Sequence, residues 1–265
     1  MQRITAKKTM VKICGLRRPE DAQAANELNP DLAGFILSPG YRRSIDTEQA
    51  KKLREILSPK IRTVGVFVDA PSDEILRAAK SGCIDMIQLH GREDDAYITR
   101  LTGLTDLPVI KAFRISEKKD LEAAAASAAH WILLDSGAGT GKPFDWDLLE
   151  RFLQEGKNRG ESERVTENPE KKDCAEMTES AEMTKCALGT SSAEIKLSNI
   201  FPGGHPWLLA GGLTAENVGA AIRRFHPTVV DVSSKVETDG FKDPAKMAAF
   251  IAAVRADQHP RIIYS

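Results

Sequence analysis

Short apolar segments alternate with amphipathic segments along most of the chain. The apolar segments are nearly continuous in hydrophobic residues, which is typical of strands buried on both faces of a parallel sheet. A turn and an amphipathic segment follow each of them. The pattern predicts eight strands, at residues 11–16, 32–38, 62–69, 85–90, 108–113, 131–135, 207–212 and 229–234.

A helix is expected after each strand, because apolar residues there repeat on one face with helical spacing. Pro19, Glu20 and Asp21 suit the first turn of the first helix. Thr214 is expected to cap the helix that follows the seventh strand. The helices are predicted to begin near residues 19, 46, 72, 93, 117, 145, 214 and 244.

Eight strand–helix units are the number that closes a (β/α)₈ TIM barrel with parallel strands. An open doubly wound sheet is the rival α/β fold, but the chain lacks an early Gly-x-Gly-x-x-Gly turn. We therefore predict a single TIM-barrel domain over residues 1–265. Residues 154–203 are rich in Glu, Lys, Ser and Thr without apolar periodicity, so we expect a disordered insertion there.

Composition narrows the classes of partner. Hydrophobic residues make up 42% of the chain and charged residues 28%, and the formal net charge is -1. We expect no nucleic-acid partner and no membrane span, since a span needs about 20 apolar residues. The polar start of the chain is unlike a signal peptide, and the four cysteines lack disulfide or zinc spacing. We therefore expect a cytoplasmic protein, either a monomer or a homodimer.

Two polar side chains stand at the tips of expected strands, where the active site of a TIM barrel lies. Lys12 and Cys14 share one face of the first strand, and Leu133 and Asp135 share one face of the sixth. A thiol and a carboxyl that face one space suit a general base and a general acid. The alternatives are that Cys14 is a small buried apolar residue and that Asp135 only caps a turn.

The loops after the seventh and eighth strands have the features of a phosphate site. Gly211 and Gly212 allow close approach of the backbone to an anion, and Ser233 and Ser234 add hydroxyl groups. The phosphorylated ligand of such a site would be a small molecule. The alternative is that the two glycines only turn the chain into a helix.

Three other features point to the same end of the barrel. The pair Arg42-Arg43, in the loop beyond the second strand, either lies in solvent or binds a carboxylate through a guanidinium. His90 ends the fourth strand and is either part of the site or a barrel residue with its own partners. The glycines of residues 137–141 supply hinges for a mobile lid, from which Lys142 would reach an anion.

The motifs of the chain also resemble those of a known family. Eight of them follow in order: Lys12-Ile13-Cys14-Gly15, Gly34-Phe35 through Arg42-Arg43, Val64-Gly65-Val66-Phe67-Val68, Gln88-Leu89-His90-Gly91, Leu134-Asp135-Ser136 with Gly139-Thr140-Gly141-Lys142, Phe144-Asp145-Trp146, Leu209-Ala210-Gly211-Gly212-Leu213 and Asp231-Val232-Ser233-Ser234. In this order the motifs resemble the phosphoribosylanthranilate isomerases of tryptophan biosynthesis.

The resemblance implies an aldose–ketose type isomerase. Its reaction is the Amadori rearrangement of N-(5-phospho-β-D-ribosyl)anthranilate to 1-(2-carboxyphenylamino)-1-deoxy-D-ribulose 5-phosphate, without a cofactor or a metal. By the same resemblance Cys14 is the general base, Asp135 the general acid, and Arg43 the ligand of the anthranilate carboxylate. The other substrate-binding residues implied are Gly211, Gly212, Asp231, Ser233 and Ser234.

Some residues depart from the family pattern. Lys235 stands where the family usually has glycine, so it is either strained or an aid to phosphate binding. Pro143 replaces a common threonine. Lys12 is expected to favour the thiolate of Cys14. Two other functions stay open from the sequence: a non-catalytic phosphate-binding barrel, and a related sugar-phosphate isomerase or synthase on the same fold.

Overall fold

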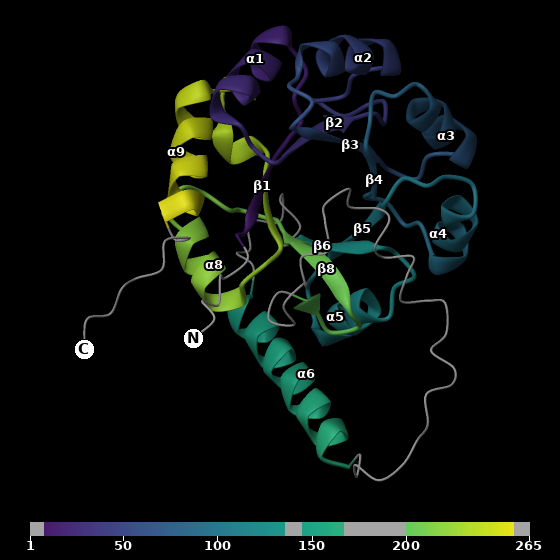
Figure 1. The fold of residues 1–265 in the computed structure, drawn as a ribbon, viewed down its shortest axis with the longest axis vertical. Coiled ribbons are helices and arrows are strands. Elements are labelled where there is room, and N and C mark those ends of the chain that lie inside the picture. Colours follow the sequence, from purple (N-terminus) through teal and green to yellow (C-terminus); the bar gives the residue numbers. More distant parts are fainter. Residues whose placement is uncertain (1–7, 136–144, 167–199, 257–265) are drawn as a thin grey trace, which may run out of the picture.

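Eight parallel strands form a closed barrel in the computed structural model, which describes residues 8–135, 145–166 and 200–256 (Figure 1). Neighbouring strands pair in order, and the pairings β6–β8 and β1–β9 close the ring. The predicted TIM barrel is therefore confirmed. Its strands are β1 (Met10–Cys14), β2 (Leu32–Ile36), β3 (Arg62–Phe67), β4 (Met86–Leu89), β5 (Val109–Arg114), β6 (Trp131–Asp135), β8 (His205–Leu209) and β9 (Val229–Val232).

Helices lie around the outside of the barrel and follow the strands, as the spacing of apolar residues predicts (Figure 1). None in the described part of the chain is long and apolar enough to cross a membrane. They are α1 (Pro19–Leu28), α2 (Thr47–Ile56), α3 (Ser72–Lys80), α4 (Asp95–Thr102), α5 (Lys118–Ala125), α6 (Trp146–Thr166), α8 (Val218–Phe225) and α9 (Pro244–Ala256).

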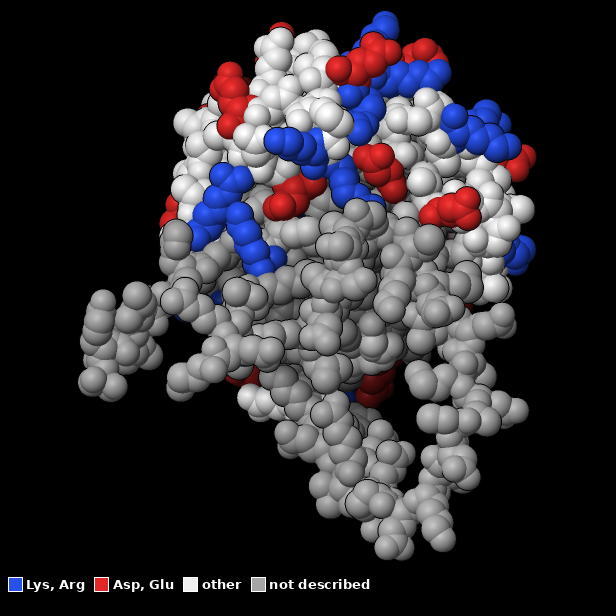
Figure 2. Space-filling view, in the orientation of Figure 1, with Lys and Arg blue, Asp and Glu red and all other residues white. Residues whose placement is uncertain are grey.

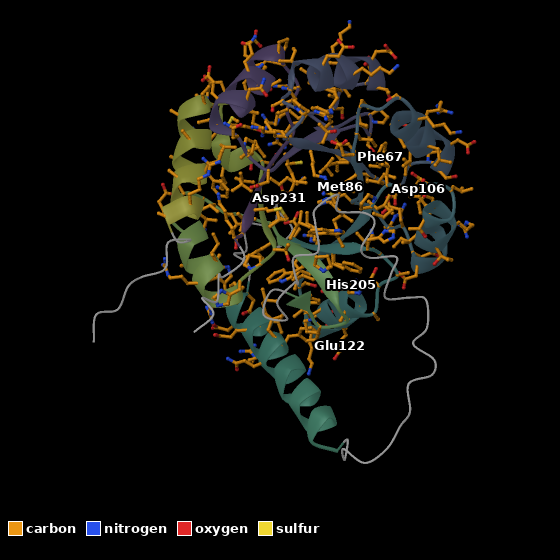
Figure 3. The ribbon with its side chains drawn as sticks, in the orientation of Figure 1. Phe67, Met86, Asp106, Glu122, His205 and Asp231 are labelled. Atoms are coloured by element: carbon orange, nitrogen blue, oxygen red, sulfur yellow. The ribbon has the colours of Figure 1, made fainter. Side chains whose placement is uncertain are left out.

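The core has two layers, because side chains alternate across each strand. Ile132 and Leu134 of β6 belong to the large cluster between barrel and helices, whereas Leu133 belongs to the cluster inside the barrel. Figure 3 shows Met86 and Asp231 near the centre of the barrel. The same alternation directs polar residues at the strand ends into the mouth of the barrel.

Side-chain caps fix the start of two helices. Asp46 accepts a hydrogen bond from the backbone of Gln49 ahead of α2, and Asp94 does the same for Tyr97 ahead of α4. The predicted cap at Thr214 is wrong. Asn217 is the residue before α8, and its amide bonds to Gly212 and Thr214 make a turn before the helix begins.

The predicted insertion at 154–203 carries regular structure at both ends. Helix α6 continues to Thr166, and β7 (Ile200–Phe201) pairs antiparallel with β8. Phe201 is buried and stacks on Phe152 at 5.6 Å between ring centroids. The expected insertion thus has regular structure at its two described ends, and residues 167–199 lie outside the described residues.

Three short elements follow β9 at the mouth of the barrel. They are the 3-10 helix η3 (Ser234–Val236) and the antiparallel pair β10 (Glu237–Thr238) and β11 (Phe241–Lys242). Figure 2 shows acidic and basic side chains interspersed on the visible face, in keeping with the net charge of -1.

Candidate active site

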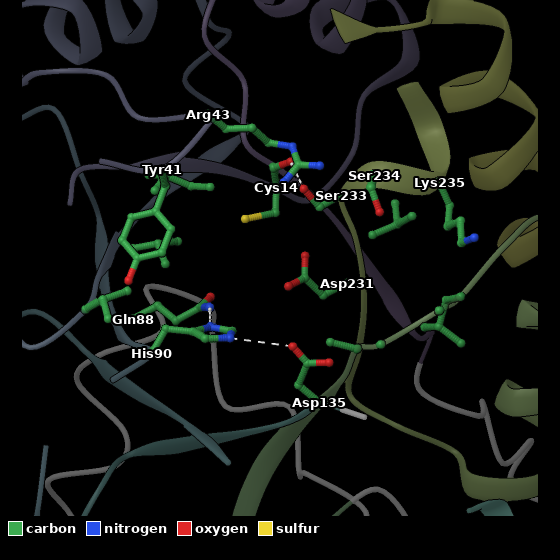
Figure 4. A pocket seen from close by; sticks show the side chains of 18 residues that line it. Cys14, Tyr41, Arg43, Gln88, His90, Asp135, Asp231, Ser233, Ser234 and Lys235 are labelled. Atoms are coloured by element: carbon green, nitrogen blue, oxygen red, sulfur yellow. Dashed lines mark hydrogen bonds and ion pairs between the residues drawn. The ribbon is translucent and has the colours of Figure 1, made fainter. Parts of the chain in front are cut away.

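A pocket of about 360 Å³ opens at the C-terminal ends of the strands. This volume is in the range of small-molecule sites. The side chains that enter it come from strands and loops far apart in the sequence (Figure 4). The polar residues that line it are Cys14, Tyr41, Arg43, Gln88, His90, Asp135, Asp231, Ser233, Ser234 and Lys235.

Cys14 is the last residue of β1 and is buried, with 7% of its surface exposed. The thiol lies beside Gly34 of β2, where a Cβ would come within 2.8 Å of Sγ. A side chain at position 34 would therefore displace the thiol. Burial raises the pKa of Cys14 above its usual value, and the Asp231 carboxylate adds to this rise, while the Lys12 ammonium opposes it.

Lys12 lies inside the barrel, fully buried, and does not line the pocket. Its Nζ donates to both carboxylate oxygens of Asp231, at 3.2 and 3.1 Å. Burial alone would lower the pKa of Lys12, but the charges of Asp231 and Cys14 outweigh it and raise the pKa. Lys12 thus lowers the pKa of Cys14, as expected, but the burial of Cys14 raises this pKa by more.

Asp135 ends β6 and faces the pocket, with 19% of its side chain exposed. His90 Nε2 lies 3.5 Å from its Oδ2. The other ring nitrogen of His90 lies 2.8 Å from the Gln88 amide nitrogen. His90 therefore belongs to the site.

Gln88 has one further property. Its Oε1 is buried and has no hydrogen-bond partner among the described residues, while the residue itself is 1% exposed. An unpaired buried amide oxygen is costly unless a ligand or a water molecule pairs with it. Its position on the pocket wall makes a substrate hydroxyl a suitable partner.

Arg43 is held by Glu237, the first residue of β10. Nε and Nη2 of Arg43 donate to the two carboxylate oxygens, at 2.6 and 3.1 Å. A guanidinium has five N–H donors in one plane, so this pair leaves the Nη1 group and a second Nη2 hydrogen for another acceptor. Arg43 lines the pocket and can bind a ligand carboxylate while Glu237 holds it.

Glu237 is the centre of a cluster of positive charges. Arg42 and Lys242 also bind it, at 2.6 and 2.8 Å, and its side chain is only 5% exposed. Burial raises its pKa, but the hydrogen bonds from Arg43, Lys242 and Arg42 outweigh burial and lower the pKa to about 2. Burial lowers the pKa of Lys242, although the Glu237 carboxylate opposes this effect. The cluster is thus anchored by an ionised carboxylate.

The loop after β8 has a backbone suited to an anion. Gly211 and Gly212 both have positive φ, of 85° and 73°, a conformation that favours glycine. A Cβ on Gly212 would meet no atom within 4 Å, so the space in front of it is open. Asn217 Nδ2 donates to the Gly212 carbonyl at 3.1 Å and braces the loop.

The loop after β9 forms the adjacent wall. Ser233 Oγ donates to the Cys14 carbonyl at 3.0 Å, which ties this loop to β1. Ser234 and Lys235 are exposed at the rim. Lys235 has no positive φ and lies within η3, so the strain expected from a residue other than glycine is absent.

The structure brings the predicted site residues to one pocket: Cys14, Arg43, Asp135, Gly211, Gly212, Asp231, Ser233 and Ser234. The predicted lid at 137–142 lies outside the described residues. Sequence reasoning missed Gln88 and Glu237. Gln88 could have been found, since it shares a strand face with His90, but no local pattern points from Glu237 to Arg43.

Comparisons with known proteins place these residues in a family. The profile of the family described as N-(5'phosphoribosyl)anthranilate (PRA) isomerase matches residues 11–160 and 192–253. The N-(5'-phosphoribosyl)anthranilate isomerase of Thermoanaerobacter sp. (strain X514) is 36% identical over 250 residues, which cover 92% of this chain and 97% of the relative.

Solved structures give the same result. Phosphoribosyl anthranilate isomerase from Thermotoga maritima superposes with a TM-score of 0.70 at 29% identity, over 94% of this chain and 99% of that one. A complex of such an isomerase with reduced 1-(o-carboxyphenylamino)-1-deoxyribulose 5-phosphate has a TM-score of 0.68 at 28% identity, with the same two coverages.

Proposed function

The chain belongs to the N-(5'-phosphoribosyl)anthranilate isomerase family, and on this premise we propose that Cys14 is its general base and Asp135 its general acid. The chain catalyses the Amadori rearrangement of phosphoribosylanthranilate, an aldose–ketose type isomerisation in tryptophan biosynthesis. The observation that carries the proposal is that the two side chains enter one pocket from β1 and β6.

Asp135 acts first, as the acid. Opening of the ribose ring breaks the bond between C1′ and the ring oxygen, and this oxygen needs a proton as it leaves. The carboxyl of Asp135 supplies that proton, while the anthranilate nitrogen donates its electron pair to C1′ and forms an imine. The neighbouring ring of His90 orients the carboxyl through the 3.5 Å contact.

Cys14 acts second, as the base. Its thiolate takes the proton from C2′, and the electrons of the C2′–H bond form a double bond to C1′ as the imine nitrogen recovers its pair. The enol that results at C2′ becomes the ketone of the product when its hydroxyl group loses its proton and C1′ takes up a proton. Because burial raises the pKa of Cys14, the thiolate is the minor form at neutral pH, but it is a strong base when it forms.

Arg43 binds the anthranilate carboxylate. The free edge of its guanidinium gives two parallel N–H donors, which match the geometry of a carboxylate. Glu237 fixes the plane of the guanidinium from the other edge. The guanidinium of Arg43 is therefore in position before the substrate binds, and this lowers the entropic cost of binding.

The substrate phosphate binds between the loops after β8 and β9. Gly211 and Gly212 supply backbone N–H groups, and Ser233 and Ser234 form the opposite wall. Asp231 lies beneath this end, where its pairing with Lys12 limits its repulsion of the phosphate. We include it among the substrate-binding residues as the polar floor of the pocket.

We also propose a cytoplasmic location and a monomer or homodimer. Cys14 and Cys83, the cysteines within the described residues, are free thiols, which suits a reducing compartment. The Thermotoga maritima enzyme is a dimer from which monomers have been generated. Sedimentation velocity over a range of concentrations distinguishes the two states.

The catalytic assignment is tested by Cys14→Ala and Asp135→Asn, with the loss of anthranilate fluorescence as the assay. We expect each kcat to fall by about a hundredfold or more, the range of acid–base contributions. Cys83→Ala and Asp106→Asn are the matched controls, because Cys83 is buried away from the pocket and Asp106 is exposed. A Cys14→Ala enzyme with normal kcat would overturn the role of the thiol.

A further inference from the structure

Lys235 lies at the rim of the pocket, directly after Ser234. It lines the cavity and is exposed, at the end away from Tyr41 and His90 (Figure 4). That end is formed by the glycine loop after β8 and the serine loop after β9. A side chain here lies beside the two loops proposed to bind the substrate phosphate, away from Tyr41 and His90.

The charges around this end single out Lys235. The lining residues Gly211, Gly212, Ser233 and Ser234 are neutral. Lys12 is committed to Asp231 at 3.1 Å, and Lys242 to Glu237 at 2.8 Å. No carboxylate among the described residues forms an ion pair with Lys235. A sugar phosphate brings close to two negative charges at neutral pH, and backbone N–H groups offset only part of them.

The backbone permits a side chain at this position. Val236 N donates to the Ser233 carbonyl at 3.4 Å, which closes the turn, and the Glu237 N–H donates to the Ser234 carbonyl. Lys235 has an ordinary negative φ in this turn. A lysine therefore costs no backbone strain, and its stem extends from a fixed point beside Ser234.

We propose that Lys235 is a cationic ligand of the substrate phosphate, added to the neutral site formed by the two loops. The inference rests on the proposed phosphate site and deepens it. The ammonium pairs with a phosphate oxygen from the solvent side, so it strengthens binding of the phosphorylated end. It does not touch C1′ or C2′, and the chemical step is unchanged by it.

The test compares Lys235→Gln, Lys235→Gly and Lys235→Arg. We expect the first two to raise KM about tenfold with kcat within about twofold, as for one lost charged hydrogen bond. Lys235→Arg keeps the charge and restores KM to within about threefold. Inorganic phosphate is the second probe: as a competitive inhibitor, its Ki rises by the same factor in the Gln and Gly variants. Lys80→Gln, an exposed lysine at the end of α3, is the control.

Gly212→Ala tests the phosphate site independently of Lys235, because the φ of 73° at Gly212 disfavours any side chain. If it raises KM and the phosphate Ki while Lys235→Gln changes neither, the role of Lys235 is wrong and the phosphate site stands. If neither variant changes KM or Ki, the phosphate site itself is wrong. Thermal unfolding of each variant shows that the protein measured is folded.

Discussion

Burial and three charged neighbours with opposing effects set the pKa of the Cys14 thiol. Burial raises this pKa most, the Asp231 carboxylate also raises it, and the ammonium groups of Lys12 and Lys242 lower it. With the Cys14 thiolate as the proposed base, kcat/KM should rise with pH until the thiol is ionised. The raised pKa places this rise above the usual range of a cysteine.

Lys12→Met should move the rise in kcat/KM to higher pH. The change removes the cation that lowers the pKa of Cys14 and leaves the Asp231 carboxylate unpaired beside the thiol. We expect a shift of about one pH unit, which is about tenfold less thiolate below the pKa. The measurement is kcat/KM across the neutral and alkaline range, on protein shown by circular dichroism to be folded.

The control for this shift is Lys51→Met. Lys51 is a surface lysine of α2 that pairs with Glu48 at 2.7 Å, far from the pocket lining. Its loss should leave the pH profile as it is. A Lys12→Met profile that coincides with that of the unmodified chain would show that Lys12 does not set the pKa of Cys14.

At the scale of single residues, the sequence predicted which residues line the pocket better than it predicted which side chains pair with one another. Strand alternation correctly directed Cys14 and Asp135 into the mouth of the barrel. Alternation does not give distances, so the pairing of Lys12 with Asp231 and of Arg43 with Glu237 was not foreseen. Such pairs join residues about two hundred positions apart, and only the closed fold brings them together.

At the scale of elements, β1 and β2 meet at the thiol of Cys14, the proposed general base. Cys14 pairs in register with Gly34, and the missing side chain of Gly34 makes the room that Sγ fills. The close fit explains why a glycine stands in an otherwise apolar strand. The position of the Cys14 thiol is therefore fixed by two strands rather than by one residue.

Gly34→Ala should damage catalysis more than stability. The new Cβ would lie 2.8 Å from Sγ, so the thiol must rotate or the strands must separate. Misplacement by about 1 Å costs roughly a hundredfold in rate, and we expect kcat to fall by about that factor. The comparison is with Gly103→Ala at the end of α4, where the nearest atom to an added Cβ is at 3.5 Å. Equal kcat values in the two variants would contradict this account.

The ends of elements were predicted less well than their order. Five strands, β1, β2, β3, β8 and β9, were expected to end two or three residues later than they do, whereas the predicted bounds of β6 match the structure. The cap at Thr214 failed because Asn217 provides a stronger local alternative, an amide that bonds to two loop residues. Composition does not show which of two nearby polar side chains makes the hydrogen bonds at the start of a helix.

At the scale of the molecule, the segment between α6 and β8 divides into parts with different roles. Apolar periodicity ends near Leu153, yet α6 continues to Thr166, through a stretch that contains Gln, Glu, Lys and Arg, which have good helix propensity. Figure 1 shows α6 extending away from the barrel. Phe201, in contrast, packs between Phe152 and Trp207 in the core. The count of strands predicted the barrel, but composition alone did not predict the helix and the strand at the two ends of this segment.

Removal of residues 167–199 should leave the isomerase intact. The segment joins a helix to a strand, so it enters the barrel at the end opposite to the active site. The family profile also skips residues 161–191. A Gly/Ser linker of about ten residues has a root-mean-square span of roughly 17 Å. Gly156 lies next to Pro202, because a Cβ added to Gly156 would be 2.8 Å from Pro202. From Gly156 to Thr166, α6 advances by roughly 15 Å, and a linker of this span can return the chain over that distance.

We expect the shortened chain to keep kcat/KM within about twofold and its melting temperature within a few degrees. The contrasting deletion, of residues 156–203, also removes Phe201, a buried ring whose loss alone costs about 3–5 kcal/mol in comparable cores. Phe201→Ala in the full chain measures that cost directly and should lower the melting temperature without raising KM. If the shorter deletion destabilises the protein as much as Phe201→Ala does, residues 167–199 contribute to the barrel and the division proposed for this segment is wrong.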